Sequence, residues 1–199
     1  AKVEIGEEQA AIGEVQLLML DDLDYLDGVN LAIEGGAGAG KSTLAALLQQ
    51  HYGGTVFHTD DFFLRPEQRT KERLAEPGGN MDRERFRAEV LEPLVRGETV
   101  RYRPFSCRTM SLGEPLTVEP GRLCMVEGAY CMHPELAAAY DLSVFLDVDP
   151  ALQRQRIEKR NTPEQAAQFF ARWIPMEQRY FEAEDIPKRC TLRIRIGNF

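Results

Sequence analysis

The sequence lacks the features of a membrane-spanning or disulfide-stabilised protein. No apolar run approaches the roughly 18 consecutive residues of a transmembrane helix, and the N-terminal segment is acidic where a signal peptide would be basic and then apolar. Its four cysteines form neither a C-x-x-C pair nor a zinc-like quartet, which is typical of reduced thiols in a cytosolic protein. We therefore expect a cytoplasmic protein with no membrane partner.

Positive charge is also scarce. The chain has 24 Lys and Arg against 32 Asp and Glu, a net charge of -8. Binding to a nucleic-acid backbone depends on clustered cations, so we expect no nucleic-acid partner. The 199 residues contain no internal repeat and fit a single α/β domain over residues 1–199. Residues 1–28 form an N-terminal extension whose pattern does not separate a hairpin from a helix.

What the sequence does have is a glycine-rich loop between an apolar strand-like run and a helical pattern, within residues 29–48. The loop matches the phosphate-binding pattern G-x-x-x-x-G-K-[ST], and Thr43 follows it. The residues concerned are Gly35, Gly36, Ala37, Gly38, Ala39, Gly40, Lys41 and Ser42. Glycines let backbone N–H groups approach phosphate oxygens, and the next helix adds its dipole. The glycine spacing does not fit the dinucleotide pattern G-x-G-x-x-G.

The loop therefore predicts a bound nucleoside triphosphate, ATP in our interpretation, together with Mg²⁺. Lys41 would reach the β- and γ-phosphates, and the Ser42 hydroxyl is a candidate magnesium ligand. The sequence leaves open whether GTP can replace ATP.

Acidic residues follow two apolar runs that are typical of buried strands. Asp60 and Asp61 come after residues 55–59, and Glu127 comes after residues 123–126. In a parallel sheet the ligand crevice lies at the carboxyl ends of the strands, where Asp60 and Glu127 would meet the loop. Asp60 is the candidate that orients an acceptor hydroxyl, and Glu127 the candidate that holds a magnesium-bound water. Asp61 either supports the water shell of the metal or caps a turn.

Four short motifs in this order, GGAGAGKST, HTDDFF, NMD and VEGAY, resemble the uridine kinase-like group of P-loop small-molecule kinases. This group is related to nicotinamide riboside, pantothenate and phosphoribulose kinases, and the resemblance covers residues 29–181. It implies a P-loop NTPase fold, a three-layer α/β/α arrangement around a mainly parallel five-stranded sheet with the P-loop strand in the centre. It also implies MgATP-dependent phosphorylation of a small hydroxyl compound, with Asp60 orienting the acceptor.

The acceptor side departs from that resemblance. A hairpin is expected over residues 99–118, where uridine kinases carry a Tyr-Asp pair and a base-contacting histidine; this chain has Phe105-Ser106 and then Arg108. We therefore favour a non-pyrimidine acceptor such as a ribosylated vitamin, a pantothenate-like compound or a sugar. Arg108 suggests an acidic or carbonyl-rich acceptor, or is simply exposed. The expected acceptor-binding residues are Asp61, Phe62, Asp82, Tyr102 and Arg108.

Three of these residues have a second interpretation. Asp82 resembles the family's substrate-contacting Asn-x-Asp, yet it also suits the N-cap of a helix over residues 83–96. Phe62 and Tyr102 suit either a pocket wall or the core. The expected helix would turn Phe86, Val90, Leu91, Leu94 and Val95 inward, with a kink at Pro93 and its end at Gly97.

Arg156 and Arg160 lie four residues apart, on one face of a helix within an expected helical flap over residues 150–180. They would stabilise charge on the γ-phosphoryl group and exclude water. The alternative is a solvated basic face paired with glutamates. Residues 191–196 alternate and predict an edge strand.

Other protein classes fit less well. The guanine-nucleotide strings D-x-x-G and N-K-x-D are absent, which argues against a switch GTPase. A nucleotide-binding regulatory protein or an ATPase without kinase activity stays an alternative. The sequence permits a homo-oligomer without indicating one.

Overall fold

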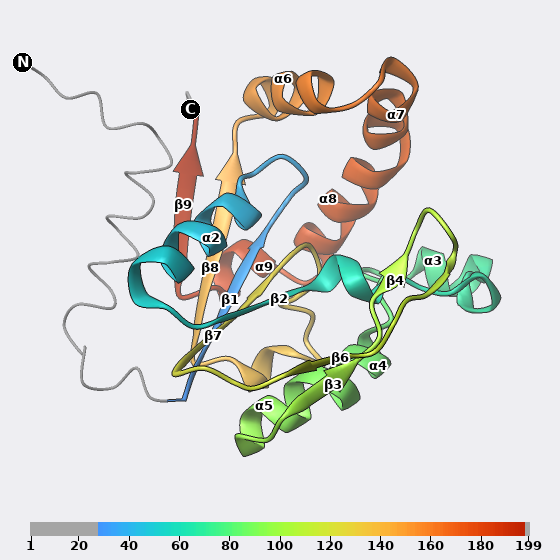
Figure 1. Ribbon diagram of the computed structural model, residues 1–199. Coiled ribbons are helices and arrows are strands. Elements are labelled where there is room, and N and C mark those ends of the chain that lie inside the picture. Colours follow the sequence, from blue (N-terminus) through green and yellow to red (C-terminus); the bar gives the residue numbers. More distant parts are fainter. Residues whose placement is uncertain (1–27, 198–199) are drawn as a thin grey trace, which may run out of the picture.

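The computed structural model describes residues 28–197, so the expected extension at 1–28 lies outside the described residues except for Gly28. Within them, five strands form one parallel sheet in the order β2-β7-β1-β8-β9. The strands are β1 (Val29–Gly35), β2 (Thr55–His58), β7 (Leu123–Glu127), β8 (Leu142–Val148) and β9 (Leu192–Ile196). The predicted α/β fold is confirmed: the P-loop strand β1 is central, and the sheet is entirely parallel (Figure 1).

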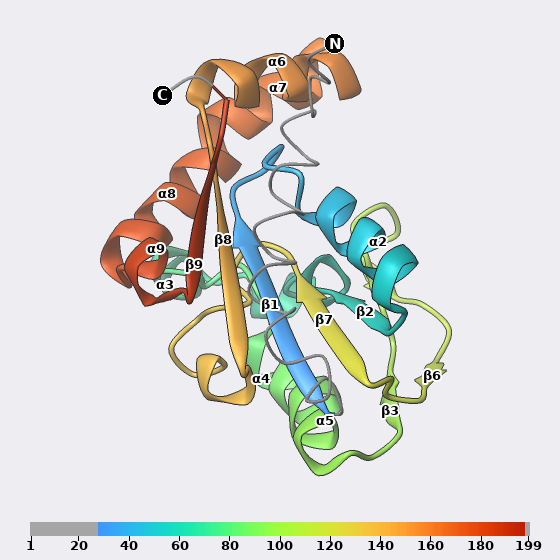
Figure 2. The same cartoon turned by 90° about the vertical axis from the view of Figure 1, so that its left-hand side faces the viewer.

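Helices cover both faces of this sheet, because alternate side chains of its strands point to opposite sides. Leu31 and Ile33 of β1 pack with Leu44 and Leu48 of α2 (Lys41–Tyr52). Ala32, between them, belongs to a second core on the other face. That core is closed by α4 (Arg83–Phe86), α5 (Glu92–Arg96), α8 (Ile174–Ala183) and α9 (Ile186–Arg189). Figure 2 shows α2 and α8 on opposite sides of the strands.

Short elements complete the chain. Two antiparallel pairs lie where the hairpin over residues 99–118 was expected: β3 (Val100–Tyr102) with β6 (Leu116–Val118), and β4 (Phe105–Ser106) with β5 (Ser111–Leu112). The remaining helices are α3 (Lys71–Ala75), α6 (Pro150–Arg160) and α7 (Pro163–Gln168). Single 3₁₀ turns occupy Thr59–Phe62, Pro66–Gln68 and Ala137–Ala139. No helix among the described residues is long and apolar enough to cross a membrane.

Both helices with an internal proline contain a π turn just before it. The turn Arg87–Leu91 precedes Pro93, and the turn Phe169–Trp173 precedes Pro175. A proline ring clashes with the carbonyl four residues earlier, and the wider π turn makes room for it. Each helix therefore continues through its proline; at Pro93 the sequence indicated a kink.

The π turn also explains one wrong prediction in the first of these helices. Phe86, Val90, Leu91 and Leu94 are buried as expected, but Val95 is 61% exposed. One extra residue in the turn rotates the following positions around the helix axis, so Val95 leaves the buried face.

We predict opposite outcomes for neighbouring truncations in this helix. Leu94→Ala should lower the free energy of unfolding by about 2–5 kcal/mol, because it removes a buried side chain and leaves a cavity. Val95→Ala should change it by at most about 0.5 kcal/mol. Urea denaturation of the two variants measures the difference, and an equal loss in both would contradict the observed helix register.

Candidate active site

The glycine-rich loop joins β1 to α2 at the carboxyl edge of the sheet, as the motif predicts. Gly35 ends the strand with φ of 151°, and a Cβ there would lie 2.7 Å from the carbonyl oxygen of Leu146. No other residue type fits so close to the neighbouring strand. Lys41 opens the helix, and its Nζ donates a hydrogen bond to the Gly36 carbonyl at 2.9 Å. In this position the lysine holds the loop through Gly36 and also lines the cavity described below.

The second acid, Glu127, lies at the end of β7 beside the start of α2. It is buried, and its Oε1 accepts a hydrogen bond from Ser42 Oγ at 3.0 Å. His58 Nδ1, from the end of β2, lies 2.5 Å from the same oxygen. Burial alone would raise the pKa of Glu127, but the hydrogen bond with His58 and the charge of Lys41 outweigh it and lower that pKa. Glu127 is therefore held ionised.

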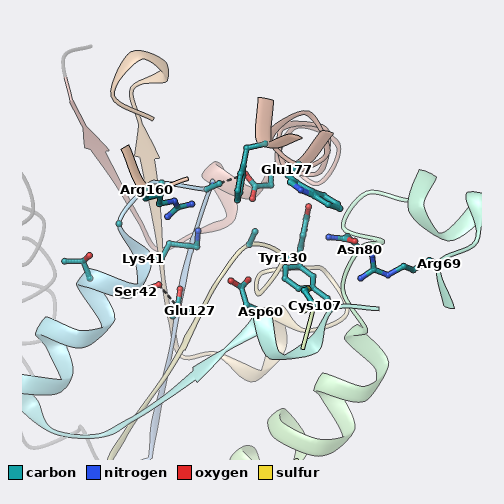
Figure 3. Close-up of a pocket in the computed structure, with 18 of the residues that line it drawn as sticks. Lys41, Ser42, Asp60, Arg69, Asn80, Cys107, Glu127, Tyr130, Arg160 and Glu177 are labelled. Atoms are coloured by element: carbon teal, nitrogen blue, oxygen red, sulfur yellow. Dashed lines mark hydrogen bonds between the residues drawn. The ribbon is translucent and has the colours of Figure 1, made fainter. Parts of the chain in front are cut away.

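Asp60 lies in the 3₁₀ turn after β2, and its carboxylate opens into a cavity of about 560 Å³ (Figure 3). Lys41, Ser42 and Glu127 line the same cavity, so strand ends far apart in sequence meet as predicted. Although water reaches Asp60, the surrounding walls desolvate it and raise its pKa, with Lys41 opposing and Glu127 adding to the shift.

The two arginines of α6 take different positions. Arg160 lines the cavity and lies over the ring of Phe169 at 5.6 Å from its centroid. Arg156 does not line it, and its Nη1 donates to the carbonyl of Gly38 at 3.0 Å. The helix therefore presents one arginine to the cavity and uses the other to contact the loop.

The residues expected to bind an acceptor do not line the described cavity. Phe62 is fully buried, with its ring 5.0 Å from that of Phe86, so it belongs to the core. Asp82 is buried and accepts hydrogen bonds from the Arg85 amide at 3.2 Å and from Gln68 Nε2 at 3.0 Å. Its carboxylate is thus used as the helix cap, the alternative that the sequence left open.

The other three lie near the cavity but outside its lining. Tyr102 is buried and its hydroxyl donates to Asp61 Oδ2 at 3.3 Å, so these two residues bind each other. Arg108 is exposed on the turn between β4 and β5. Its neighbours Cys107 and Met110 line the cavity in its place.

Two polar residues that were not expected at the site hold the tip of the loop. Glu177 of α8 accepts a hydrogen bond from the Ala37 amide at 2.9 Å, and Gln153 of α6 donates to the Ala37 carbonyl at 2.8 Å. Both side chains are buried. Burial raises the pKa of Glu177, and the charge of Lys41 partly offsets this. No motif marks either residue, because each contacts the loop only through the tertiary fold.

Glu34 was also missed, although an acid inside the apolar run of β1 is a usable signal. Its carboxylate is fully buried and accepts hydrogen bonds from the amides of Tyr130 and Met132, both at 2.9 Å. The Tyr180 hydroxyl donates to it at 3.1 Å. Burial raises the pKa of Glu34 to about 7, even though these donors favour the ionised form. The segment after β7 is thereby attached to the P-loop strand, with Tyr130 at a positive φ of 78°.

The donor set near Ser42 and Glu127 suits magnesium. Mg²⁺ prefers oxygen ligands and keeps several waters, so one hydroxyl and one carboxylate are enough protein ligands beside a triphosphate. Within residues 28–197, no group of three or more His, Cys, Asp or Glu could hold a metal by itself. The residues therefore fit a metal that arrives with a nucleotide better than an independent metal centre.

No known family model matches the sequence. The structure, however, is similar to solved kinases. A possible uridine kinase from Bacillus stearothermophilus has a TM-score of 0.65 and 21% identity, over 89% of this chain and 99% of its own. A candidate fructose transport system kinase from a Silicibacter species has a TM-score of 0.67 and 23% identity, over 90% and 98%. D-glycerate 3-kinase from Cryptococcus neoformans has a TM-score of 0.59 and 16% identity, over 94% of this chain and 93% of its own. The chain shares the fold of these proteins.

We predict that the contact between His58 and Glu127 stabilises the protein more at low pH than at high pH. The hydrogen bond with Glu127 raises the pKa of His58 above 6.5. The contribution of this contact to the free energy of unfolding is therefore complete below pH 6.5 and is lost as the pH rises through the pKa of His58 in the folded state. The free energies of unfolding of wild type and His58→Ala, measured without nucleotide or metal, should differ less at pH 9 than at pH 6. His51→Ala controls for loss of an exposed imidazole; a difference that grows with pH would contradict the pairing.

Proposed function

We propose that the chain is an ATP-dependent phosphotransferase of the uridine kinase-like group, which moves the γ-phosphoryl group to a hydroxyl of a small metabolite. The observation that carries the proposal is that Asp60 and the loop residues Lys41 and Ser42 face one cavity. A triphosphate on the loop would leave Asp60 free to meet a second substrate. The fold shared with kinases supports the same conclusion.

In this proposal each residue has one task in the transfer. Asp60 orients the acceptor hydroxyl and takes its proton as the oxygen bonds to the γ-phosphorus. The bond from that phosphorus to the bridging oxygen breaks, and ADP leaves with the electron pair. Lys41 and the loop amides hold the phosphates, and Arg160 stabilises the charge on the transferred group. Ser42 and Glu127 would hold Mg²⁺, which neutralises phosphate charge when bound.

The acceptor is expected to be a non-pyrimidine hydroxyl compound, such as a ribosylated vitamin, a pantothenate-like compound or a sugar. The described hairpin residues facing the cavity, Cys107 and Met110, include no histidine that would contact a base. We further propose a cytoplasmic enzyme that acts without nucleic acid or membrane. A nucleotide-binding regulatory protein or an ATPase is the competing function.

An ADP-release screen decides between these functions. Purified protein with MgATP would be tested against nucleosides, ribosylated vitamins, pantothenate and sugars. We expect one acceptor class to stimulate ADP release. Release that no acceptor stimulates would favour the regulatory protein or ATPase, and a signal with uridine or cytidine would contradict the expected non-pyrimidine acceptor.

Asp60→Asn should lower kcat by about 100-fold or more, because a positioned general base contributes about this much to proton transfer. The affinity for ATP, measured by calorimetry, should stay unchanged. Asp61→Asn is the matched control, since that carboxylate binds Tyr102 outside the cavity lining and its loss should cost much less. Near-normal turnover by Asp60→Asn would rule out the assigned role.

Lys41→Ala should abolish binding of MgATP, because the lysine both contacts the triphosphate and holds the loop through Gly36. Calorimetric titration measures this loss. Lys159→Ala removes an exposed cation near the end of α6 and should leave binding intact. If Lys41→Ala bound nucleotide normally, the loop would not be the triphosphate site.

A further inference from the structure

Three cationic side chains line the cavity: Lys41, Arg160 and Arg69. The first two lie near the glycine-rich loop. Arg69, together with Asn80, lies on the side of Asp60 that faces away from Lys41 and Arg160 (Figure 3). A triphosphate on the loop accounts for the first two cations and leaves Arg69 without an explanation.

Arg69 differs from the other arginines of its segment in having no acidic partner among the described residues. Between residues 65 and 87 every other arginine pairs with a carboxylate. These are Arg65, Arg73, Arg83, Arg85 and Arg87. Among the described residues no carboxylate pairs with Arg69, although its side chain is half-buried in a protein with excess negative charge. A partly desolvated cation without a counter-charge is costly, and an anionic ligand would remove that cost.

One residue, Leu64, makes hydrogen bonds to both Arg69 and Asn80. Arg69 Nε donates to the carbonyl of Leu64 at 2.9 Å, and the Leu64 amide donates to the carbonyl of Asn80 at 3.2 Å. The guanidinium also lies over the ring of Phe105, 5.9 Å from its centroid. Leu64 is buried, so the Arg69 side chain and the Asn80 backbone are anchored to the core, and both residues line the cavity.

Their chemistry suits an anion. The arginine fork matches the paired oxygens of a carboxylate or phosphate, and the Nη nitrogens of Arg69 make no ion pair with the described residues. The side-chain amide of Asn80 lines the cavity and has no hydrogen-bond partner among those residues, so it can donate to a second oxygen. Nearby, burial raises the pKa of the Cys107 thiol and Arg69 partly offsets this, which leaves a neutral group beside the guanidinium.

We propose that the acceptor carries an anionic group, a carboxylate or a phosphate, that binds Arg69 and Asn80 while its hydroxyl lies at Asp60. The inference rests on the proposed kinase function and adds the chemical class of its acceptor. It also moves the expected recognition of an acidic acceptor from Arg108, which is exposed outside the cavity lining, to Arg69.

The test compares matched acceptors in the ADP-release assay. Hydroxy acids would be paired with their amides, such as glycerate with glyceramide, and sugar phosphates with the free sugars, such as ribose 5-phosphate with ribose. One anionic series should exceed its neutral counterparts in kcat/KM by about 10- to 100-fold, the worth of a charge-assisted bidentate contact. The two series separate a carboxylate from a phosphate.

Substitutions then assign the effect to the residue. Arg69→Gln should raise KM for the anionic acceptor by about 10- to 100-fold and leave KM for ATP unchanged. Arg69→Lys keeps the charge but lacks the guanidinium fork, so its KM for the anionic acceptor should lie between those of wild type and Arg69→Gln. Arg87→Gln is the matched control, because Arg87 is an exposed arginine paired with Glu92 on the helix surface.

A binding measurement separates failure of this inference from failure of the kinase function. The same anions would be titrated by calorimetry with a non-hydrolysable ATP analogue and Mg²⁺ already bound, which occupies the loop. Anion binding that depends on Arg69, without any turnover, would support the anion site and overturn the kinase function. Three results would each overturn the anionic acceptor. The first is turnover of neutral acceptors that Arg69→Gln leaves unchanged, and the second is a loss of turnover of the anionic acceptor that Arg108→Gln causes and Arg69→Gln does not. The third is that no anion binds in a way that depends on Arg69.

Discussion

The buried carboxylate of Glu34 accepts hydrogen bonds from two other parts of the chain that build the site. It belongs to β1, directly before the glycine-rich loop, and it binds the amides of Tyr130 and Met132 and the hydroxyl of Tyr180. A carboxylate without partners would be costly at full burial, so these donors and the acid require one another. The loop, the segment after β7 and helix α8 are therefore held in one arrangement, and the cavity lies between them.

Around that cavity the protein gives neighbouring carboxylates different proton affinities. His58 and Lys41 lower the pKa of Glu127, whereas desolvation raises the pKa of Asp60. Two nearby acids whose pKa values are moved apart can take different tasks, one as a permanent anion and one as a proton acceptor. Glu127 suits contact with a cation, and Asp60 suits contact with a hydroxyl. The same division underlies the proposed transfer.

The helices after β8 are attached to the loop as well as lying beside it. Gln153 and Arg156 of α6 donate to the carbonyls of Ala37 and Gly38, and Glu177 of α8 accepts from the Ala37 amide. A displacement of either helix would therefore strain the loop that is proposed to bind the phosphates. The π turn before Pro175 lets the polypeptide pass from α7 into α8 without a break, which keeps Trp173 on the cavity wall and Glu177 against the loop.

The sequence by itself determined the side of the cavity that the glycine-rich loop forms. The loop, Asp60 and Glu127 are each specified by a local pattern, an apolar strand followed at once by glycine or an acidic residue, and parallel strands bring such ends to one edge. The acceptor side was decided by the tertiary structure. Phe62 and Asp82 were expected to bind an acceptor. Instead, Phe62 packs against Phe86 in the core, and the Asp82 carboxylate caps α4. Arg69 and Asn80 line the same cavity, and the backbone of Leu64 hydrogen-bonds to both; Glu177 reaches Ala37 across 140 residues. No periodicity encodes such contacts, because they depend on which distant segments the core brings together.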